Sequence, residues 1–479
     1  GCGRSSLMRQ AMHAVASTRP VPPDLCYLHN FEAPDRPIAL RLPAGQGRTL
    51  QSAMASWVKN LHTDISQRLA SADTKAEAAA IEKTWQIQED EHFAALEALA
   101  QTHQFRIARE GGQMMFTLTG PKGQPLTESE ARALPPARRA DIEAAERTLR
   151  TEIAHFLEAT RPFERARDDA LSALQRQAIA PLVEQGLQSA QASLGMPPAD
   201  TLKPTPLTQW QAHIQRSVLA HIDLFLPVPI DPAGGADSDA EADRKDELED
   251  LLARYQVNLV VDNSRQTAAP VMVEDHPTAR TLFGSIEHGS QDDAVQAGHA
   301  SVQAGSLLKA HGGFLLLHLH DVASEEGLWP KLRRFLRCGK LHIEDASGAA
   351  QGAGGAVALQ PEPVQVDVKL VVIGSVDEYY ALQEADPDAA RRFRAKVDFA
   401  ERFTATPATH HATAIFIAHS CHRRGLPHCA PDAVALLLEH THREADDQHR
   451  QSALFAHTEA LLIESAALCT ARGAPLVQA

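Results

Sequence analysis

An uninterrupted apolar run in the middle of the chain constrains the fold more than any other feature. Residues 314–317 read Phe-Leu-Leu-Leu and directly follow Gly312 and Gly313. A short apolar run bounded by glycines predicts a strand covered on both faces, as in a parallel α/β sheet, because a half-exposed strand would alternate. In the parallel sheets of nucleotide-hydrolysing enzymes, such a strand ends in acidic groups that hold Mg²⁺. Here the first polar residue is His318, and the acid comes three places later, at Asp321.

A second apolar run, residues 368–373, predicts another buried strand that ends at Gly374 and Ser375. The pattern near residues 328–338 predicts a helix between the two runs. Ligands bind in the crevice at the carboxyl ends of the strands of open α/β sheets. We therefore expect a ligand site near His318 and Ser375. The alternative is an α/β core that binds no ligand.

Composition limits the classes of protein to which the chain can belong. Its 479 residues are enough for two to four domains. The formal net charge of −15 makes nucleic acid an unlikely partner, because binding its backbone requires clustered Lys and Arg. The six cysteines have no paired spacing, which favours a reducing, cytoplasmic setting over a disulfide framework. No apolar run approaches the roughly 18 residues that span a bilayer, so we expect no membrane association.

Changes in residue pattern divide the chain into five parts. Apolar residues spaced three or four apart predict long helices on either side of a hairpin signature near residues 103–120. The predicted fold is α/β plus α, a parallel sheet core with a helical, coiled-coil insertion and C-terminal helices. The apolar stripes of the insertion form either a bundle core or a binding surface. The parts are 1–48 (start of the α/β core), 49–230 (insertion), 231–250 (an acidic loop), 251–405 (the rest of the core) and 406–479 (helices only).

The first residues, Gly1-Cys2-Gly3-Arg4-Ser5-Ser6, run directly into a helical pattern. A glycine loop that opens a helix turns backbone N–H groups towards a phosphate, and its Lys and Ser/Thr reach the phosphates and Mg²⁺. Here Arg4 stands where the Lys is expected, and Ser5 where the Mg²⁺ hydroxyl is expected. A flexible N-terminal tail is the alternative. Because the sequence starts inside this motif and lacks an initiator Met, we expect further residues upstream.

In collinear order, most of the chain resembles the AAA+ module of the Lon-related ATP-dependent proteases, in the branch with a large helical insertion after the phosphate loop. The resemblance implies a homo-oligomeric ring, usually a hexamer, that uses ATP to unfold proteins. It also implies that the substrates are unfolded or damaged proteins. It also implies a Ser-Lys peptidase domain after the C-terminal helical lid. The 479 residues of this sequence contain no convincing Ser-Lys dyad. The segments that carry the likeness are 26–31, 42–47, 255–264, 277, 282–288, 305–315 and 367–374.

The resemblance also assigns residues to a nucleotide site. It places Gly1, Gly3, Arg4, Ser5 and Ser6 in the phosphate loop and Ser375 at the end of the strand that senses the γ-phosphate, with Ser5 and Asp321 as candidate Mg²⁺ ligands. His318 falls on the position of the Mg²⁺-binding acid, and an imidazole suits Mg²⁺ poorly because that ion prefers oxygen ligands.

Arginine positions of the family pattern are also altered. The sensing arginine of the lid should fall near residues 452–455, which read Ser-Ala-Leu-Phe. Arg391, Arg392 and Arg394 are candidates for an arginine that reaches a neighbouring subunit, and Arg394 is grouped with His318 and Asp321 as a candidate catalytic residue. A solvated basic surface is the alternative for this run.

We therefore expect an AAA+ module whose ATP hydrolysis is weak or lost, although ATP or ADP and Mg²⁺ remain candidate ligands. Removing one well-placed charge from such a site costs on the order of 10² to 10³ in rate. One alternative is a fully active ATPase in which Asp321 and Arg4 substitute. Another is a scaffold with a metal site at Cys421, His422, His428 and Cys429. We expect no zinc there, because adjacent Cys421 and His422 point to different faces of a helix.

Overall fold

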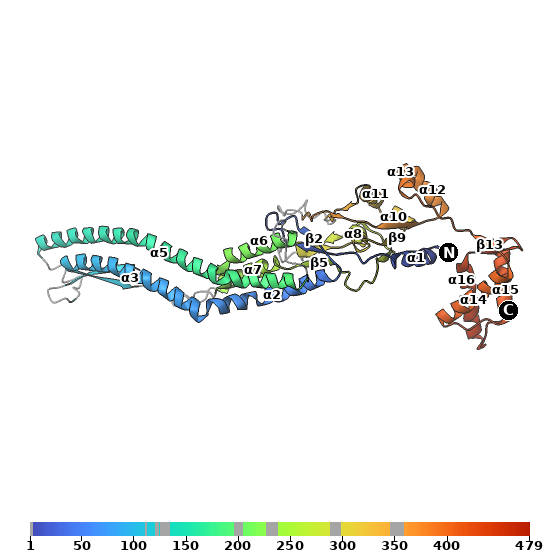
Figure 1. Cartoon of the computed structure of the whole chain (residues 1–479), viewed down its shortest axis with the longest axis horizontal. Helices are drawn as coiled ribbons and strands as arrows, with labels where there is room; N and C mark the ends of the chain where they lie inside the picture. The colour runs from blue at the N-terminus through green and yellow to red at the C-terminus, as the bar shows by residue number, and fades with distance from the viewer. Residues whose placement is uncertain are drawn as a thin grey trace. The chain divides into compact units, whose positions relative to one another are not determined.

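The computed structural model describes residues 3–110, 113–119, 124, 135–195, 205–226, 238–287, 298–344 and 359–479 (Figure 1). The chain forms two compact units. The first comprises residues 1–27, 33–48 and 258–479, and the second comprises residues 28–32 and 49–257.

A three-stranded parallel sheet lies in the first unit, and its central strand is the predicted apolar run. Strand β9 (Phe314–His318) pairs with β12 (Lys369–Ile373) on one side and with β6 (Val271–Glu274) on the other. The three leucines of β9 are fully buried. The prediction of parallel strands covered on both faces is confirmed for β9.

Gly313 shows why the run must follow a glycine. A Cβ atom at this position would lie 1.9 Å from the carbonyl oxygen of Pro270, so a side chain would push β6 away from β9. Gly312 has a φ of +77°, a conformation that glycine adopts without strain.

A second sheet in this unit has the order β2-β1-β5, with β2 spanning Ile38–Leu42, β1 Asp24–Leu28 and β5 Asn258–Val261. The Asp24 side chain is fully buried at the start of β1. One of its oxygens accepts a hydrogen bond from the Gly47 N–H at 2.9 Å, and the other accepts one from the Asn263 N–H at 2.8 Å. Asp24 therefore connects β1 to the beginning of helix α2 (Gln46–Leu69) and to the residues that follow β5.

Short helices surround the parallel sheet and join its strands. Leu315 and Leu317 of β9 belong to one apolar core with Leu332 and Phe335 of α11. The helices of this part are α1 (Arg4–Ala16), α8 (Ala279–Phe283), α9 (Ser306–Lys309), α10 (Leu319–Ser324), α11 (Leu328–Cys338), α12 (Val376–Ala385) and α13 (Pro387–Arg392). Two small antiparallel pairs complete it, β7 (Ser285–Ile286) with β8 (Val302–Gln303) and β10 (Lys340–Leu341) with β11 (Val364–Gln365).

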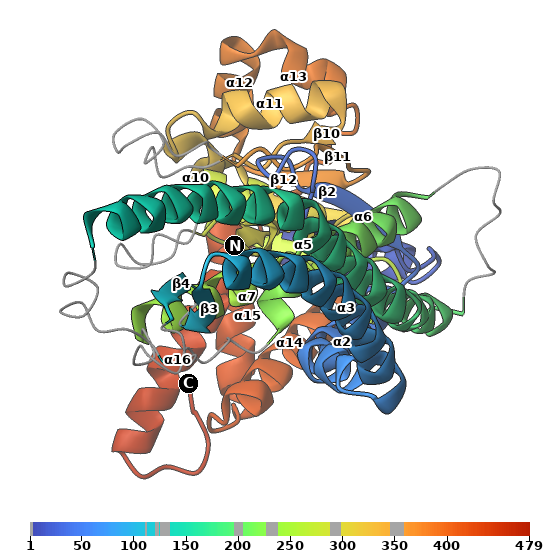
Figure 2. The same cartoon turned by 90° about the vertical axis from the view of Figure 1, so that its left-hand side faces the viewer.

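The described residues of the second unit are mainly helical and include one hairpin. Helices α3 and α5 lie side by side in both views (Figures 1 and 2), and Leu96, Ile107, Leu149 and Phe156 form part of one apolar cluster between the helices and the hairpin. The predicted hairpin is confirmed. The elements are α2 (Gln46–Leu69), α3 (Ala72–Thr102), β3 (Phe105–Glu110), β4 (Gln113–Leu118), α5 (Pro136–Ala192), α6 (Pro206–Ala220), η1 (Ile222–Phe225) and α7 (Ser238–Ala253).

The expected acidic loop over residues 231–250 is wrong for its larger part. Residues 238–250 belong to helix α7, and residues 231–237 lie outside the described part of the chain. Acidic residues and alanines support a helix where a few apolar contacts anchor it. Leu251 is buried, and Arg244 donates a hydrogen bond to the carbonyl oxygen of Leu226 at 2.9 Å.

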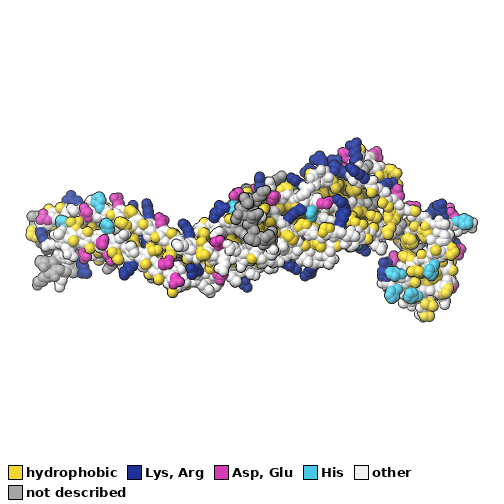
Figure 3. Space-filling view, viewed as in Figure 1, with side chains coloured by type: hydrophobic (Ala, Val, Ile, Leu, Met, Phe, Trp, Pro, Cys, Tyr) yellow, Lys and Arg dark blue, Asp and Glu magenta, His cyan; other side chains and the backbone are white. Residues whose placement is uncertain are grey.

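The C-terminal residues form three helices and one small strand pair. Ile417, Cys421 and Leu462 form a buried apolar cluster between two of the helices. The prediction of helices only is incomplete here, because β14 pairs antiparallel with β13. The elements are β13 (Arg402–Thr404), α14 (Pro407–Arg424), α15 (Pro431–Ala445), β14 (Arg450–Ser452) and α16 (Phe455–Ala471). Histidines gather on the surface of these helices (Figure 3).

Within the described residues, no helix has both the length and the apolar composition needed to cross a bilayer.

Candidate functional site

Helix α1 presents an unusual N-terminus to one side of the parallel sheet. Gly3 precedes the helix with a φ of +74°, and no side chain caps the first turn. That turn contains Arg4 and no acidic residue, although acidic side chains normally favour this end of a helix. The helix dipole and the guanidinium therefore add up to a positive end that favours an anion.

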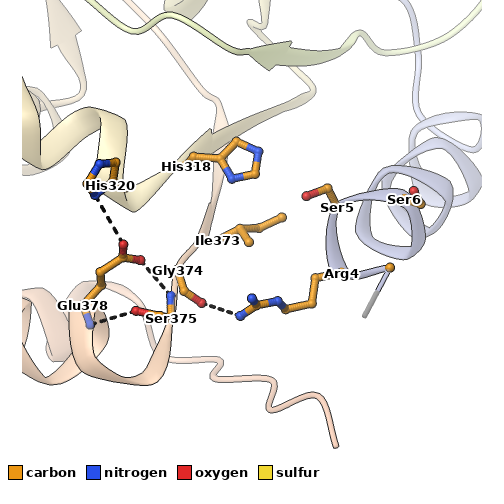
Figure 4. A pocket seen from close by; sticks show the side chains of 10 residues that line it. Arg4, Ser5, Ser6, His318, His320, Ile373, Gly374, Ser375 and Glu378 are labelled. Carbon is orange, nitrogen blue, oxygen red and sulfur yellow. Dashed lines mark hydrogen bonds and ion pairs between the residues drawn. The ribbon is translucent and has the colours of Figure 1, made fainter. Parts of the chain in front are cut away.

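The carboxyl ends of β9 and β12 meet this helix end. His318 and Ile373 are the last residues of their strands and pair with each other in the sheet register. Arg4 Nη1 donates a hydrogen bond to the carbonyl oxygen of Gly374 at 2.7 Å, which joins the first turn of α1 to the end of β12 (Figure 4).

A cavity of about 460 Å³ lies between these elements. His318, Ser5 and Ile373 face the same hollow in Figure 4. The hollow brings together a guanidinium, two imidazoles, three hydroxyls and one carboxyl group. Its lining consists of Gly3, Arg4, Ser5, Ser6, His318, His320, Ile373, Gly374, Ser375 and Glu378.

Glu378 provides the only carboxyl group of this lining, and both of its oxygens have partners. One oxygen accepts a hydrogen bond from the Ser375 N–H at 2.7 Å, as part of a capping box at the start of α12. The other lies 3.5 Å from Nδ1 of His320. The Ser375 hydroxyl accepts in turn from the Glu378 N–H at 3.2 Å. Glu378 therefore fixes the beginning of α12 beside the cavity.

The structure brings together most of the residues that the sequence singled out. Gly3, Arg4, Ser5, Ser6, His318 and Ser375 all line the cavity, whereas Gly1 lies outside the described residues. Their roles in binding stay predictions.

Four charged residues that the sequence singled out lie outside the lining of the cavity. Asp321 lies half-buried in the first turn of α10 and is not part of the lining. Arg394 is exposed and donates a hydrogen bond to the carbonyl oxygen of Arg391 at 3.4 Å. Arg391 pairs with Asp388, and Arg392 donates to the carbonyl oxygen of Leu336 at 3.0 Å. None of these arginines lines this cavity. Their reach to the nucleotide of a neighbouring subunit stays a prediction.

Sequence reasoning missed four lining residues: His320, Ile373, Gly374 and Glu378. A signal existed for Glu378, because a Ser followed three residues later by a Glu is the signature of a capping box. No comparable signal marked His320, whose position depends on the turn from β9 into α10.

The candidate zinc site at residues 421–429 has a different environment from the one that its sequence suggested. Cys421 is fully buried, and Cys429 packs against the same apolar cluster. Burial and the neighbouring Cys421 raise the pKa of the Cys429 thiol, which disfavours the thiolate that binds zinc. Within the described ranges, no group of three or more His, Cys, Asp or Glu could share a metal ion. The expectation of no zinc stays a prediction.

Three family models match separate segments of the chain. The model described as "LonB-like, AAA domain" matches residues 267–400, which contain the parallel sheet. The "Lon-like LonC helical domain" matches residues 24–56, and the "Archaeal LonB, AAA+ ATPase LID domain" matches residues 428–479.

Among solved structures, the chain is similar to the crystal structure of NtrX from Brucella abortus, with 16% identity and a TM-score of 0.30. The match covers 62% of this chain and 61% of the length of the NtrX chain. No curated protein matches this chain.

Proposed function

Because the chain carries a Lon-like AAA+ module, we propose that it is the nucleotide-responsive ring module of a Lon-type ATP-dependent protease. In this proposal, the cavity at the end of β9 and β12 binds the phosphates of ATP or ADP, and hydrolysis is weak or lost. The module assembles as a homo-oligomeric ring, a hexamer as the family resemblance implies, and handles unfolded or damaged protein substrates.

One observation supports the nucleotide site above all others. Residues from the start of α1, the end of β9 and the end of β12 line one cavity, although more than 300 positions separate α1 from the two strand ends in the sequence. A phosphate group fits these residues. Arg4 supplies a positive charge, Ser5 and Ser6 supply hydroxyl donors, and the first turn of α1 supplies a helix N-terminus.

Weak hydrolysis follows from the groups at the end of β9. Phosphoryl transfer requires a metal ion held by carboxylates and an oriented water. His318 stands at the end of the strand, and Asp321 lies outside the lining. When nucleotide is bound, these residues can hold its phosphates but provide little of the chemistry that cleaves them.

Two measurements on the purified chain test the proposal. Isothermal titration with ATP should show one site per chain, and phosphate release should be slower by a factor on the order of 10² to 10³ than in AAA+ motors with an intact site. An absence of ATP and ADP binding would overturn the nucleotide site. Turnover at the rate of ordinary AAA+ motors would overturn weak hydrolysis and favour the active ATPase instead.

A further inference from the structure

Within the described residues, the lining of the cavity at the carboxyl end of β9 has no carboxylate without partners to hold Mg²⁺. Mg²⁺ requires near-octahedral oxygen ligands and is usually bound through one or two carboxylates together with substrate phosphates. Among the lining residues, Glu378 has the single carboxyl group, and its oxygens already face the Ser375 N–H and His320.

Glu274 and Asp321, two other acids near this edge of the sheet, lie outside the lining. Glu274 ends β6, but one of its oxygens accepts a hydrogen bond from the Ser306 hydroxyl and the other accepts one from the His276 N–H at 3.4 Å. Neither Glu274 nor Asp321 lines the cavity. Besides Glu378, the side chains of the described lining therefore offer Mg²⁺ only neutral hydroxyls and imidazoles, a set that holds the ion poorly.

The same lining is well suited to phosphate oxygens. Arg4 and the uncapped first turn of α1 provide positive charge, and His318 faces Ser5 across the hollow (Figure 4). An imidazole N–H donates a hydrogen bond to a phosphate oxygen, whereas a carboxylate at that position would repel it unless a cation lay between them. An imidazole at the end of β9 is therefore able to contact a phosphate oxygen without an intervening metal ion.

We propose that the cavity binds its nucleotide without a divalent cation, with the His318 imidazole donating a hydrogen bond to a phosphate oxygen. The inference rests on the proposed nucleotide site. It defines the ligand as the metal-free polyphosphate chain of ATP or ADP.

The test compares ATP affinity in excess Mg²⁺ with ATP affinity in EDTA. For the wild-type chain, the two dissociation constants should agree within about threefold, because the one carboxyl group of the described lining already has partners on both oxygens. His318→Asp restores a carboxylate, so its affinity in EDTA should fall at least about tenfold below its affinity in Mg²⁺. His318→Asn is the matched control, because it changes the side chain without adding charge, and its two dissociation constants should agree.

Glu378→Gln removes the only carboxyl group of the lining and keeps an oxygen that can accept from the Ser375 N–H. Its affinities in the two buffers should also agree, which tests the inference even if His318→Asp fails to fold. Wild-type binding that requires Mg²⁺, or a Mg²⁺-dependent affinity that Glu378→Gln abolishes, would overturn the inference while leaving the nucleotide site intact. No ATP binding in either buffer would overturn the proposed function, and this inference with it.

Discussion

Arg4 donates a hydrogen bond to the carbonyl oxygen of Gly374 across 2.7 Å, and this contact joins two parts of the sequence that lie 370 positions apart. The guanidinium has five N–H donors, so one bond to the backbone leaves others for a ligand. The contact holds the positive charge at the rim of the cavity in a fixed orientation. Under the proposed function, Arg4 is therefore already oriented when a phosphate binds.

Replacing Arg4 should weaken nucleotide binding. Arg4→Ala removes a charge-assisted contact worth about 1.5 to 3 kcal/mol, so the dissociation constant for ATP should rise by roughly 10- to 100-fold in a titration. Arg9→Ala is the control, because Arg9 is exposed on the same helix and does not line the cavity. Equal affinity in the Arg4→Ala and Arg9→Ala variants would show that the phosphates bind elsewhere.

Asp24 should stabilise the first unit through its two backbone partners. Asp24→Ala leaves the buried N–H groups of Gly47 and Asn263 without an acceptor, so the free energy of unfolding should fall by roughly 2 to 4 kcal/mol in urea. Asp275→Ala, at an exposed position, should change it by no more than about 0.5 kcal/mol. Similar stabilities for the two variants would mean that Asp24 does not connect these segments.

Gly186 and Trp57 should be energetically coupled in the helical unit. A Cβ atom at Gly186 would lie 2.1 Å from Nε1 of Trp57, so Gly186→Ala should destabilise the protein by about 1 to 3 kcal/mol despite the better helix propensity of alanine. In a Trp57→Leu background, the same substitution should cost at least about 1 kcal/mol less. A double-mutant cycle by urea unfolding measures this difference, and additive effects would contradict the contact.

The C-terminal helices should lose the stabilisation that Glu459 provides as the pH falls. The bond from Arg424 at 2.8 Å, together with Arg423 at 2.9 Å, lowers the pKa of the Glu459 carboxyl group. Because the folded state favours the charged form of Glu459, this stabilisation is present above the pKa of a glutamate in the unfolded chain, about 4.3. It is lost as the pH falls through the lower pKa of Glu459 in the folded state.

The size of the effect should be about 1 kcal/mol or less, because solvent screens the half-exposed arginines. The stability difference between the wild type and Glu459→Gln, measured by thermal unfolding, should shrink from pH 6 to pH 3. Glu464→Gln, exposed on the same helix, should show no such trend. A difference for Glu459→Gln that is constant with pH would argue against the ion pair.

The sequence predicted those parts of the fold that depend on local pattern. The apolar run of β9 and the hairpin of β3 and β4 were readable because burial on both faces and alternation leave direct signatures. Helix α7 was misread as a loop, because a helix on a surface needs few apolar residues once contacts such as that of Leu251 anchor it. The short strand β14 carries too few residues for a periodic signal.

The candidate site was predictable to the extent that its residues belong to motifs. The loop at Arg4 and the strand ends at His318 and Ser375 could be located from the sequence. The sequence also placed Asp321 close to the site, but the chain turns into α10 directly after His318 and carries Asp321 out of the lining. His320 and Glu378 come together only through the packing of α10 beside α12, which no local pattern encodes.

The most direct test of the nucleotide site is a crystal structure of the chain grown with ATP. We predict that the phosphates lie within hydrogen-bonding distance of Arg4, Ser5 and His318, at the carboxyl ends of β9 and β12. Nucleotide bound at another place, or a cavity that stays empty of nucleotide at saturating ATP, would contradict it.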